Sequence, residues 1–216
     1  MNKYLRNSKY NSVVITLAIL GLISYLAPTR NEQIKITYSY PATACPANVT
    51  KATAIAALPN SKIGKRLIDG KIKKFTSANA NSIVLGENSI LIDGNPGTAL
   101  TFVNNTWKAV VPCSVSNGEQ WFVGGSGALT SKSILSIVNS GFSESAVEIG
   151  VYTSTGVLEP KQVAISPNST KSISLDTLAP GEDSLAISVK TKSGRVSSFL
   201  FDERKKGLRS LGADYV

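Results

Sequence analysis

The sequence AVEIGVYT at Ala146–Thr153 is the clearest indication of the fold class. Its apolar residues stand at alternate positions: Val147, Ile149 and Val151. Polar or small residues and a tyrosine fill the positions between them. Alternation with a period of two is typical of an antiparallel strand that buries one face and exposes the other. The stretch therefore predicts a half-buried β-strand.

Further short segments rich in β-branched and aromatic residues surround this strand. The seven predicted strands of this region are Gln120–Val123, Ile134–Val138, Ala146–Thr153, Gln162–Ile165, Ser172–Leu175, Leu185–Thr191 and Arg195–Phe201. Seven strands with a turn about every eight to twelve residues are typical of an immunoglobulin-like sandwich. We predict such a sandwich over residues 119–205, followed by a polar tail over 206–216 that is loosely held.

The region before residue 119 also predicts strands, so the expected fold class is all-β. Its candidate strands are Ile34–Tyr40, Val49–Ala57, Ile63–Ile68, Lys71–Phe75, Ser82–Leu85, Ser89–Asp93, Ala99–Asn104 and Thr106–Pro112. Asp69-Gly70 favours a type I′ turn. We therefore expect Ile63–Ile68 and Lys71–Phe75 to pair as a hairpin, within a β region over residues 31–118.

Residues 1–30 have the pattern of a membrane-targeting segment. Three basic residues come first: Lys3, Arg6 and Lys9. An apolar run follows from Val13 to Ala27, which is about 22 Å long as a helix, against the roughly 30 Å of a bilayer core. Because Tyr25 and Pro28 disfavour cleavage after Ala27, an uncleaved signal-anchor is preferred to a cleaved signal peptide. We expect a single-pass plasma-membrane protein with its N-terminus in the cytoplasm and its bulk outside, in contact with the lipid bilayer, or a secreted protein if the leader is cut.

The sequence contains two cysteines, Cys45 and Cys113. An even pair in an oxidising compartment favours a disulfide, and the alternative is two buried free thiols. On the chain-entropy model, such a disulfide stabilises the fold by about 4 kcal/mol.

The composition excludes several kinds of chemistry. The chain has no histidine, which rules out Ser-His-Asp and Cys-His mechanisms and histidine-ligated metals. Two cysteines cannot form a four-thiolate metal site. The acidic residues fall mostly at turns or on outward strand positions, so a pair of catalytic carboxylates has little support. We expect a protein that is not an enzyme and that carries no metal or cofactor.

The net charge of +9 arises in the N-terminal third of the chain. The densest basic patch comprises Lys62, Lys65, Arg66, Lys71, Lys73 and Lys74. This patch predicts contact with anionic headgroups or wall polymers, and the alternative is that it protects an exposed sheet edge from aggregation. Nucleic acid is not expected, because the chain is exported and no aromatic residues are interleaved with the basic ones.

Trp107 and Trp121 lie on either side of Cys113 in the sequence. A tryptophan on an open surface can stack on a sugar ring, whereas one in a sandwich core often packs against a disulfide. The exposure of each indole separates a glycan contact from a core position.

Several short motifs occur in a recognisable order. They are Cys45-Pro46, Trp107 with Pro112-Cys113, Trp121–Gly125, Leu135–Asn139, Ser154–Gly156, Ile165–Ser169 and Leu178–Gly181. In this order the chain resembles an actinobacterial exported family, the domain of unknown function 5719, over about residues 45–205. The resemblance implies β-sandwich modules at the cell envelope, with Cys45 and Cys113 paired, and implies no catalytic residues.

Together these features predict a non-catalytic, membrane-anchored scaffold or interaction protein of the cell envelope, whose partners are anionic wall polymers or envelope proteins. The alternative is a carbohydrate-binding module that uses Trp107 or Trp121 to bind wall glycan. A glycan hydrolase has less support than either.

Overall fold

The computed structural model describes residues 3–26, 42–50, 52–57, 63–78, 82–93, 97–207 and 209–216. The chain divides into two compact units, Met1–Tyr38 and Ser39–Val216. The predicted strand Ile34–Tyr40 and the patch residue Lys62 lie outside the described residues.

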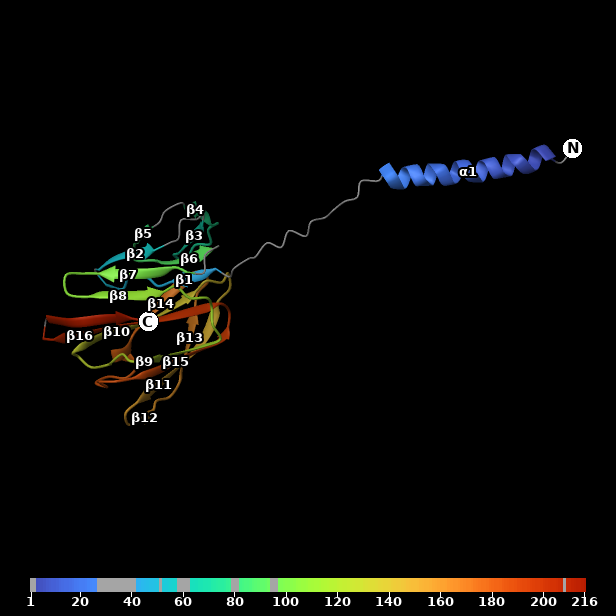
Figure 1. Ribbon diagram of the computed structural model, residues 1–216. Helices are drawn as coiled ribbons and strands as arrows, with labels where there is room; N and C mark the ends of the chain where they lie inside the picture. The colour runs from blue at the N-terminus through green and yellow to red at the C-terminus, as the bar shows by residue number, and fades with distance from the viewer. Residues whose placement is uncertain are drawn as a thin grey trace. The chain divides into compact units, whose positions relative to one another are not determined.

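The first unit contains one helix, α1 (Lys3–Leu26), drawn in blue in Figure 1. Its sequence is rich in leucine and isoleucine, and the side chains described within it, such as Leu17, are exposed. Among the described residues, no helix has both the length and the apolarity needed to cross a membrane.

The second unit consists of β-strands, which confirms the predicted all-β class of the folded part. Two four-stranded sheets come from its N-terminal half. Sheet A has the order β1 (Thr43–Cys45), β6 (Ser89–Asp93), β3 (Ile63–Ile68) and β4 (Thr76–Ala78). Sheet B has the order β5 (Ser82–Leu85), β2 (Thr53–Ala57), β7 (Ala99–Val103) and β8 (Lys108–Pro112).

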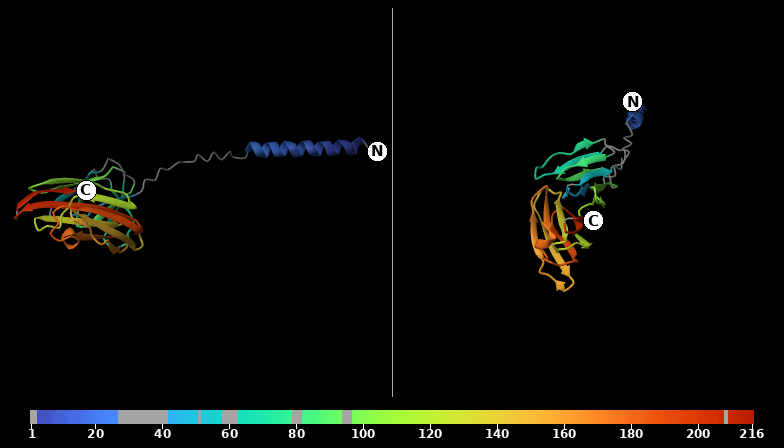
Figure 2. Two further views of the ribbon diagram at one scale, coloured as in Figure 1. Left: turned by 90° about the horizontal axis from the view of Figure 1, so that it is seen from below. Right: turned by 90° about the vertical axis from the view of Figure 1, so that its left-hand side faces the viewer.

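Two further sheets come from the C-terminal half, which occupies a different part of this unit (Figure 2). The outer sheet has the order β12 (Gly156–Val157), β11 (Ser145–Thr153), β15 (Ala186–Ser193) and β9 (Glu119–Val123), and β13 (Lys161–Ile165) also pairs with β11. The central sheet has the order β14 (Ser169–Ser174), β10 (Ser131–Asn139), β16 (Val196–Lys206) and β17 (Arg209–Tyr215). A short 3-10 helix, η1 (Leu175–Thr177), follows β14.

The central sheet is buried on both faces. Leu135 and Leu200 pair across β10 and β16 and belong to the hydrophobic core shared with the outer sheet. Val138, Phe199 and Phe201 point to the opposite face and belong to the core shared with sheets A and B. Because both faces are covered, β16 begins with six consecutive buried residues. The unit is therefore layered as outer sheet, central sheet, and then sheets A and B.

The seven predicted C-terminal strands correspond to β9, β10, β11, β13, β14, β15 and β16. Counted along the chain, the first pairs with the sixth, and the seventh pairs with the second. In the constant-type immunoglobulin order the first strand belongs to the sheet of the second strand and the seventh to the sheet of the sixth. The first and last strands have thus exchanged sheets here. The domain boundaries predicted at residues 118 and 205 stay predictions.

The C-terminal tail differs from its prediction. Residues 209–215 form β17, which pairs with β16. The ring of Tyr215 stacks on Phe102 with 4.9 Å between ring centroids, and its hydroxyl donates a hydrogen bond to the Ala47 carbonyl oxygen at 3.1 Å. The prediction of a loosely held tail was wrong because one aromatic residue, next to the chain end, anchors the segment in the core.

Candidate functional site

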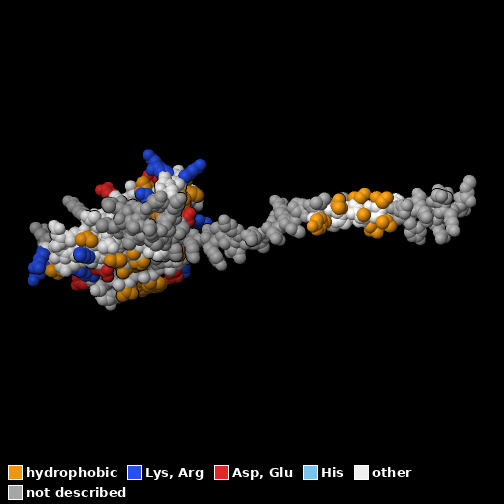
Figure 3. Space-filling view, turned by 45° about the horizontal axis from the view of Figure 1, so that its top comes forward, with side chains coloured by type: hydrophobic (Ala, Val, Ile, Leu, Met, Phe, Trp, Pro, Cys, Tyr) orange, Lys and Arg blue, Asp and Glu red, His pale blue; other side chains and the backbone are white. Residues whose placement is uncertain are grey.

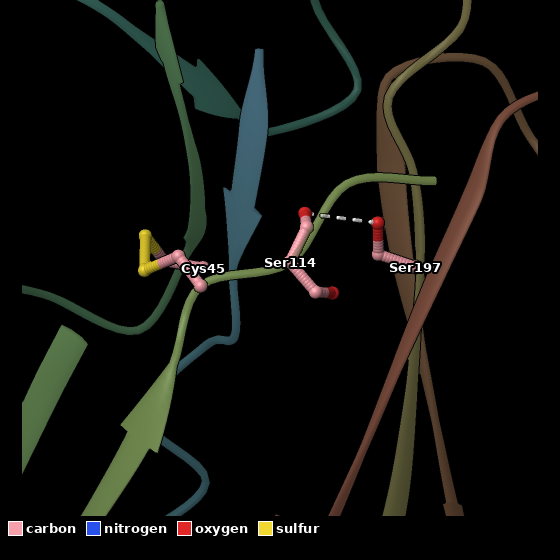
Figure 4. The surroundings of a disulfide bond; sticks show 4 residues. Cys45, Ser114 and Ser197 are labelled. Carbon is pink, nitrogen blue, oxygen red and sulfur yellow. Dashed lines mark hydrogen bonds between the residues drawn. A yellow bond between two sulfur atoms is a disulfide. The ribbon is translucent and has the colours of Figure 1, made fainter. Parts of the chain in front are cut away.

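The disulfide between Cys45 and Cys113 closes the N-terminal half, as the sequence predicted. The two Cα atoms lie 4.4 Å apart, and both side chains are buried. Next to it, Ala44 and Ser114 form an antiparallel bridge with backbone hydrogen bonds of 2.7 and 2.9 Å. Figure 4 shows Ser197 of the central sheet donating to the Ser114 carbonyl oxygen, at 3.4 Å. The disulfide thus stabilises the place where the chain passes from sheet B towards the outer sheet.

The predicted hairpin of Ile63–Ile68 with Lys71–Phe75 is wrong, because β3 pairs with β4 instead. Asn168, buried in the turn between β13 and β14, accounts for the difference. Its side-chain amide donates to the Leu67 and Lys71 carbonyl oxygens at 3.1 and 2.7 Å, and its backbone carbonyl oxygen accepts from the Gly70 N–H at 2.7 Å. These bonds hold residues 67–71 as a loop.

The five described residues of the predicted basic patch do not form one surface. Arg66 is buried, Lys65 is half-buried, and three lysines of the following loop are exposed: Lys71, Lys73 and Lys74. Lys73 pairs with Asp69 at 2.5 Å, and this hydrogen bond lowers the pKa of the Asp69 carboxyl. Figure 3 shows basic side chains projecting from the strand-rich unit. The lysine loop therefore remains an exposed basic feature, without Arg66.

The two tryptophans have opposite environments. Trp107 is only 7% exposed, and its ring lies 5.7 Å from that of Phe201. It belongs to the same core as the disulfide, so its position is that of a core residue. Trp121, on the edge strand β9, is 54% exposed.

Trp121 forms an exposed aromatic pair with Tyr152 of β11. The ring centroids lie 5.0 Å apart with an interplanar angle of 37°. Strand β15 lies between β9 and β11, and its residue Ser188 is opposite Trp121 on one side and Gly150 on the other. A Cβ atom at Gly150 would lie 2.5 Å from the Ser188 hydroxyl and 3.4 Å from the Tyr152 ring. The glycine thus lets the ring of Tyr152 lie close to the sheet.

A row of charged and amide side chains crosses the same face beside the aromatic pair. Glu119 is opposite Lys190, Lys190 is opposite Glu148, and Glu148 is opposite Gln162. The Trp121 indole N–H donates to the Glu119 carboxylate at 2.9 Å. We call Trp121, Tyr152 and this row the aromatic face.

The carboxylate of Glu148 is held in place at the middle of the row. Gln162 donates to it at 2.7 Å, and Lys192 pairs with it at 3.1 Å. The hydrogen bond from Lys192 is the main reason why the pKa of Glu148 is lowered. An aromatic ring with fixed hydrogen-bonding groups beside it can contact both the apolar face and the hydroxyls of a sugar.

Two structural centres were not predicted from the sequence. The Asn139 side-chain amide donates to the carbonyl oxygens of Ser143, Ile165 and Ser166 at 2.8 to 3.1 Å. The Gly124–Gly127 segment is largely buried, and a Cβ atom at Gly127 would lie 1.8 Å from the Ala179 carbonyl oxygen. One sign of these two centres was present in the sequence. Asn139 and Ala179 lie in motifs on which the family resemblance rests, Leu135–Asn139 and Leu178–Gly181.

The fold and this surface define a β-sandwich protein with a disulfide and an exposed aromatic face. A family model described as "Family of unknown function (DUF5719)" matches residues 108–216, just over half of the chain. The chain belongs to this family, which confirms the family predicted from the sequence; the match begins at residue 108, whereas the resemblance was expected from about residue 45.

Comparison with solved structures adds one protein from Thermotoga maritima, described as "Crystal Structure of Thermotoga maritima 1070". It is 18% identical, with a TM-score of 0.42, and the match covers 47% of this chain and 91% of that one. No curated protein matches the chain.

Proposed function

We propose that this protein is a non-catalytic interaction protein of the cell envelope, anchored at the plasma membrane by the N-terminal segment of residues 1–30, with the Ser39–Val216 unit outside. The basic residues followed by an apolar run in α1 support this topology. The disulfide supports an oxidising compartment. The two packed antiparallel sheets of the C-terminal half form a β-sandwich, an architecture common in cell-surface domains. In this proposal, anionic wall polymers contact the lysine loop.

The aromatic face is the proposed recognition surface, and its ligand is a wall glycan. The observation that carries this proposal is the exposure of Trp121 next to Tyr152 and the polar row. A large apolar ring left in water loses the stabilisation that burial would provide. A sugar ring stacked on the indole would cover it, while Glu119, Lys190 and Glu148 are positioned for hydrogen bonds to hydroxyls. A protein ligand at the same face is the competing possibility.

Retention of the full-length, detergent-solubilised protein on purified insoluble wall glycan tests the proposal. Trp121→Ala should reduce the apparent affinity about tenfold, since an aromatic stacking contact of about 1.4 kcal/mol corresponds to that factor. Val123→Ala is the matched control, because Val123 lies on the same strand and is 90% exposed. Equal retention of both variants, or retention by envelope proteins and not by glycan, would contradict a glycan ligand.

The proposed topology has a separate test. Protease added to intact spheroplasts should digest the Ser39–Val216 unit and leave the helix in the membrane fraction. Recovery of intact protein in the cytosol with Cys45 and Cys113 reduced would refute the topology, whatever the glycan result.

A further inference from the structure

A groove of about 1260 Å³ opens on the strand-rich unit, and neither Trp121 nor Tyr152 of the aromatic face lines it. Its walls come from β3 and β6 and from residues 115–118, 140–143 and 191–195. It is larger than the roughly 300–1,000 Å³ of a site for one small molecule. The groove therefore has room for a unit of an extended ligand.

Arg66, at the wall of this groove, is a buried cation. Its side chain is 4% exposed, and its guanidinium carbon lies 5.3 Å from the Phe75 ring centroid and 4.7 Å from that of Phe142. The Nη2 group donates to the Ser140 carbonyl oxygen at 2.7 Å, while the buried Nε has no hydrogen-bond partner. The guanidinium is thus held in one orientation with a donor unused.

The positive charge of Arg66 also has no carboxylate partner among the described ion pairs. Desolvation lowers the pKa of Arg66, but a guanidinium remains protonated in proteins. Cation–π contacts offset part of the cost of burying this charge. An anion bound in the groove would offset more of it, since buried charges in proteins are usually paired.

The rest of the lining favours a hydroxylated anion. Arg195 adds a second, exposed cation, and Lys192 is already paired with Glu148. Asp93 is the acidic residue among those that line the groove. Serine and threonine side chains are frequent along the walls: Ser116, Ser140, Ser143, Thr191 and Ser193. Hydroxyl groups both donate and accept hydrogen bonds, which suits them to the hydroxyls of a sugar.

We propose that this groove binds an acidic saccharide, with a ligand carboxylate at the Arg66 guanidinium and the sugar hydroxyls along the serine-lined wall. Arg195 contacts the same or the next carboxylate of the ligand. This site shares no residue with the Trp121–Tyr152 pair, so it can be correct whether or not the aromatic face binds glycan.

The test is a titration of the full-length protein in detergent micelles with trigalacturonate as the probe and neutral maltotriose as its control. We expect saturable binding of trigalacturonate only, with a shift of the Arg66 Nε–H resonance in ¹H–¹⁵N spectra. Arg195→Gln should weaken binding about three- to tenfold, because one charge-assisted contact is lost. Arg66→Lys should weaken it tenfold or more, since a lysine cannot reproduce the planar guanidinium.

The matched control is Arg209→Gln, which removes one exposed positive charge from β17, outside the groove. Its affinity for trigalacturonate should equal that of the wild type, and so should that of Trp121→Ala. The proposal is overturned if Arg209→Gln and Arg195→Gln weaken binding equally, if maltotriose binds as well as trigalacturonate, or if neither sugar shows saturable binding. Displacement of trigalacturonate by equimolar inorganic phosphate would also overturn it, because the groove would then recognise charge without the saccharide. If Arg66→Lys does not fold, the comparison of Arg195→Gln with Arg209→Gln still tests the proposal.

Discussion

Removal of the disulfide tests how the N-terminal half is stabilised. The bond joins residues separated by 68 positions, and in the chain-entropy model a loop of that size corresponds to about 4 kcal/mol of unfolding free energy. We therefore expect the double variant Cys45→Ala, Cys113→Ala to lose about 4 kcal/mol. The folded state should change little, because the backbone bonds between Ala44 and Ser114 remain.

Urea unfolding followed by tryptophan fluorescence measures this loss. Trp121→Phe serves as the background, because it leaves the buried Trp107 as the reporter of the two tryptophans in the chain. With a urea dependence of about 2 kcal/mol per molar, the midpoint should fall by about 2 M. Adding a reductant to the background protein should produce the same shift without changing any side chain.

An entropic origin of this stabilisation has two further consequences. The native fluorescence spectrum should be the same with and without the disulfide, and the loss should be similar for both ways of breaking it. A midpoint shift below about 0.5 M, or a red-shifted native spectrum, would contradict an entropic origin, since the disulfide would then either contribute little or hold the native packing itself.

Three other predictions concern single positions, each measured by denaturant unfolding. Asn168→Gly should cost about 2–3 kcal/mol, because two buried carbonyl oxygens lose their donors; Asn168→Ala should cost about 1 kcal/mol more, since φ is +46° there, and equal losses would argue against backbone strain. Burial raises the pKa of Tyr215, so its contribution to stability should be complete below pH 10, the ordinary value, and fall above it by up to about 1.4 kcal/mol per pH unit; an unchanged alkaline loss in Tyr215→Phe would contradict this. Gly127→Ala should cost about 3 kcal/mol because of its clash with the Ala179 carbonyl, whereas Gly86→Ala, with open space around it, should change stability by less than about 0.5 kcal/mol.

Strands rich in isoleucine, valine or leucine and bounded by turn residues were predictable from sequence. Ile63–Ile68, Ser82–Leu85 and Ser89–Asp93 form with the predicted bounds. Two short strands, Thr43–Cys45 and Thr76–Ala78, were missed because three residues carry no periodicity. The predicted strand Lys71–Phe75 failed for a different reason, since its neighbouring loop is determined by Asn168, about a hundred residues away in sequence.

The candidate site was predictable only in its residue types. The sequence singled out Trp121 but could not separate it from Trp107, because both have aliphatic and polar neighbours. Cross-strand register makes the distinction, by placing Trp121 opposite Ser188 on the exposed side of the outer sheet. Arg66 was grouped with nearby lysines because they are close in sequence. Its contacts are instead with Phe75 and with Phe142 and Ser140, which a loop about 75 residues later contributes.

The residues that the family model matches, 108–216, form a defined part of the fold that includes the central sheet. Residues 108–216 contain both the outer and the central sheet, and so the whole core between them. They also contain Phe199, Phe201 and Tyr215, whose side chains belong to the other core. In this chain, sheets A and B cover that second face, and all of their strands except β8 lie before residue 108. Phe102 stacks on Tyr215, and Cys45 is joined to Cys113. Since a large uncovered apolar face is a liability in water, the family region needs a cover on this side. In this chain, the disulfide attaches that cover covalently to the family region, and the same covering layer contributes Arg66 to the groove.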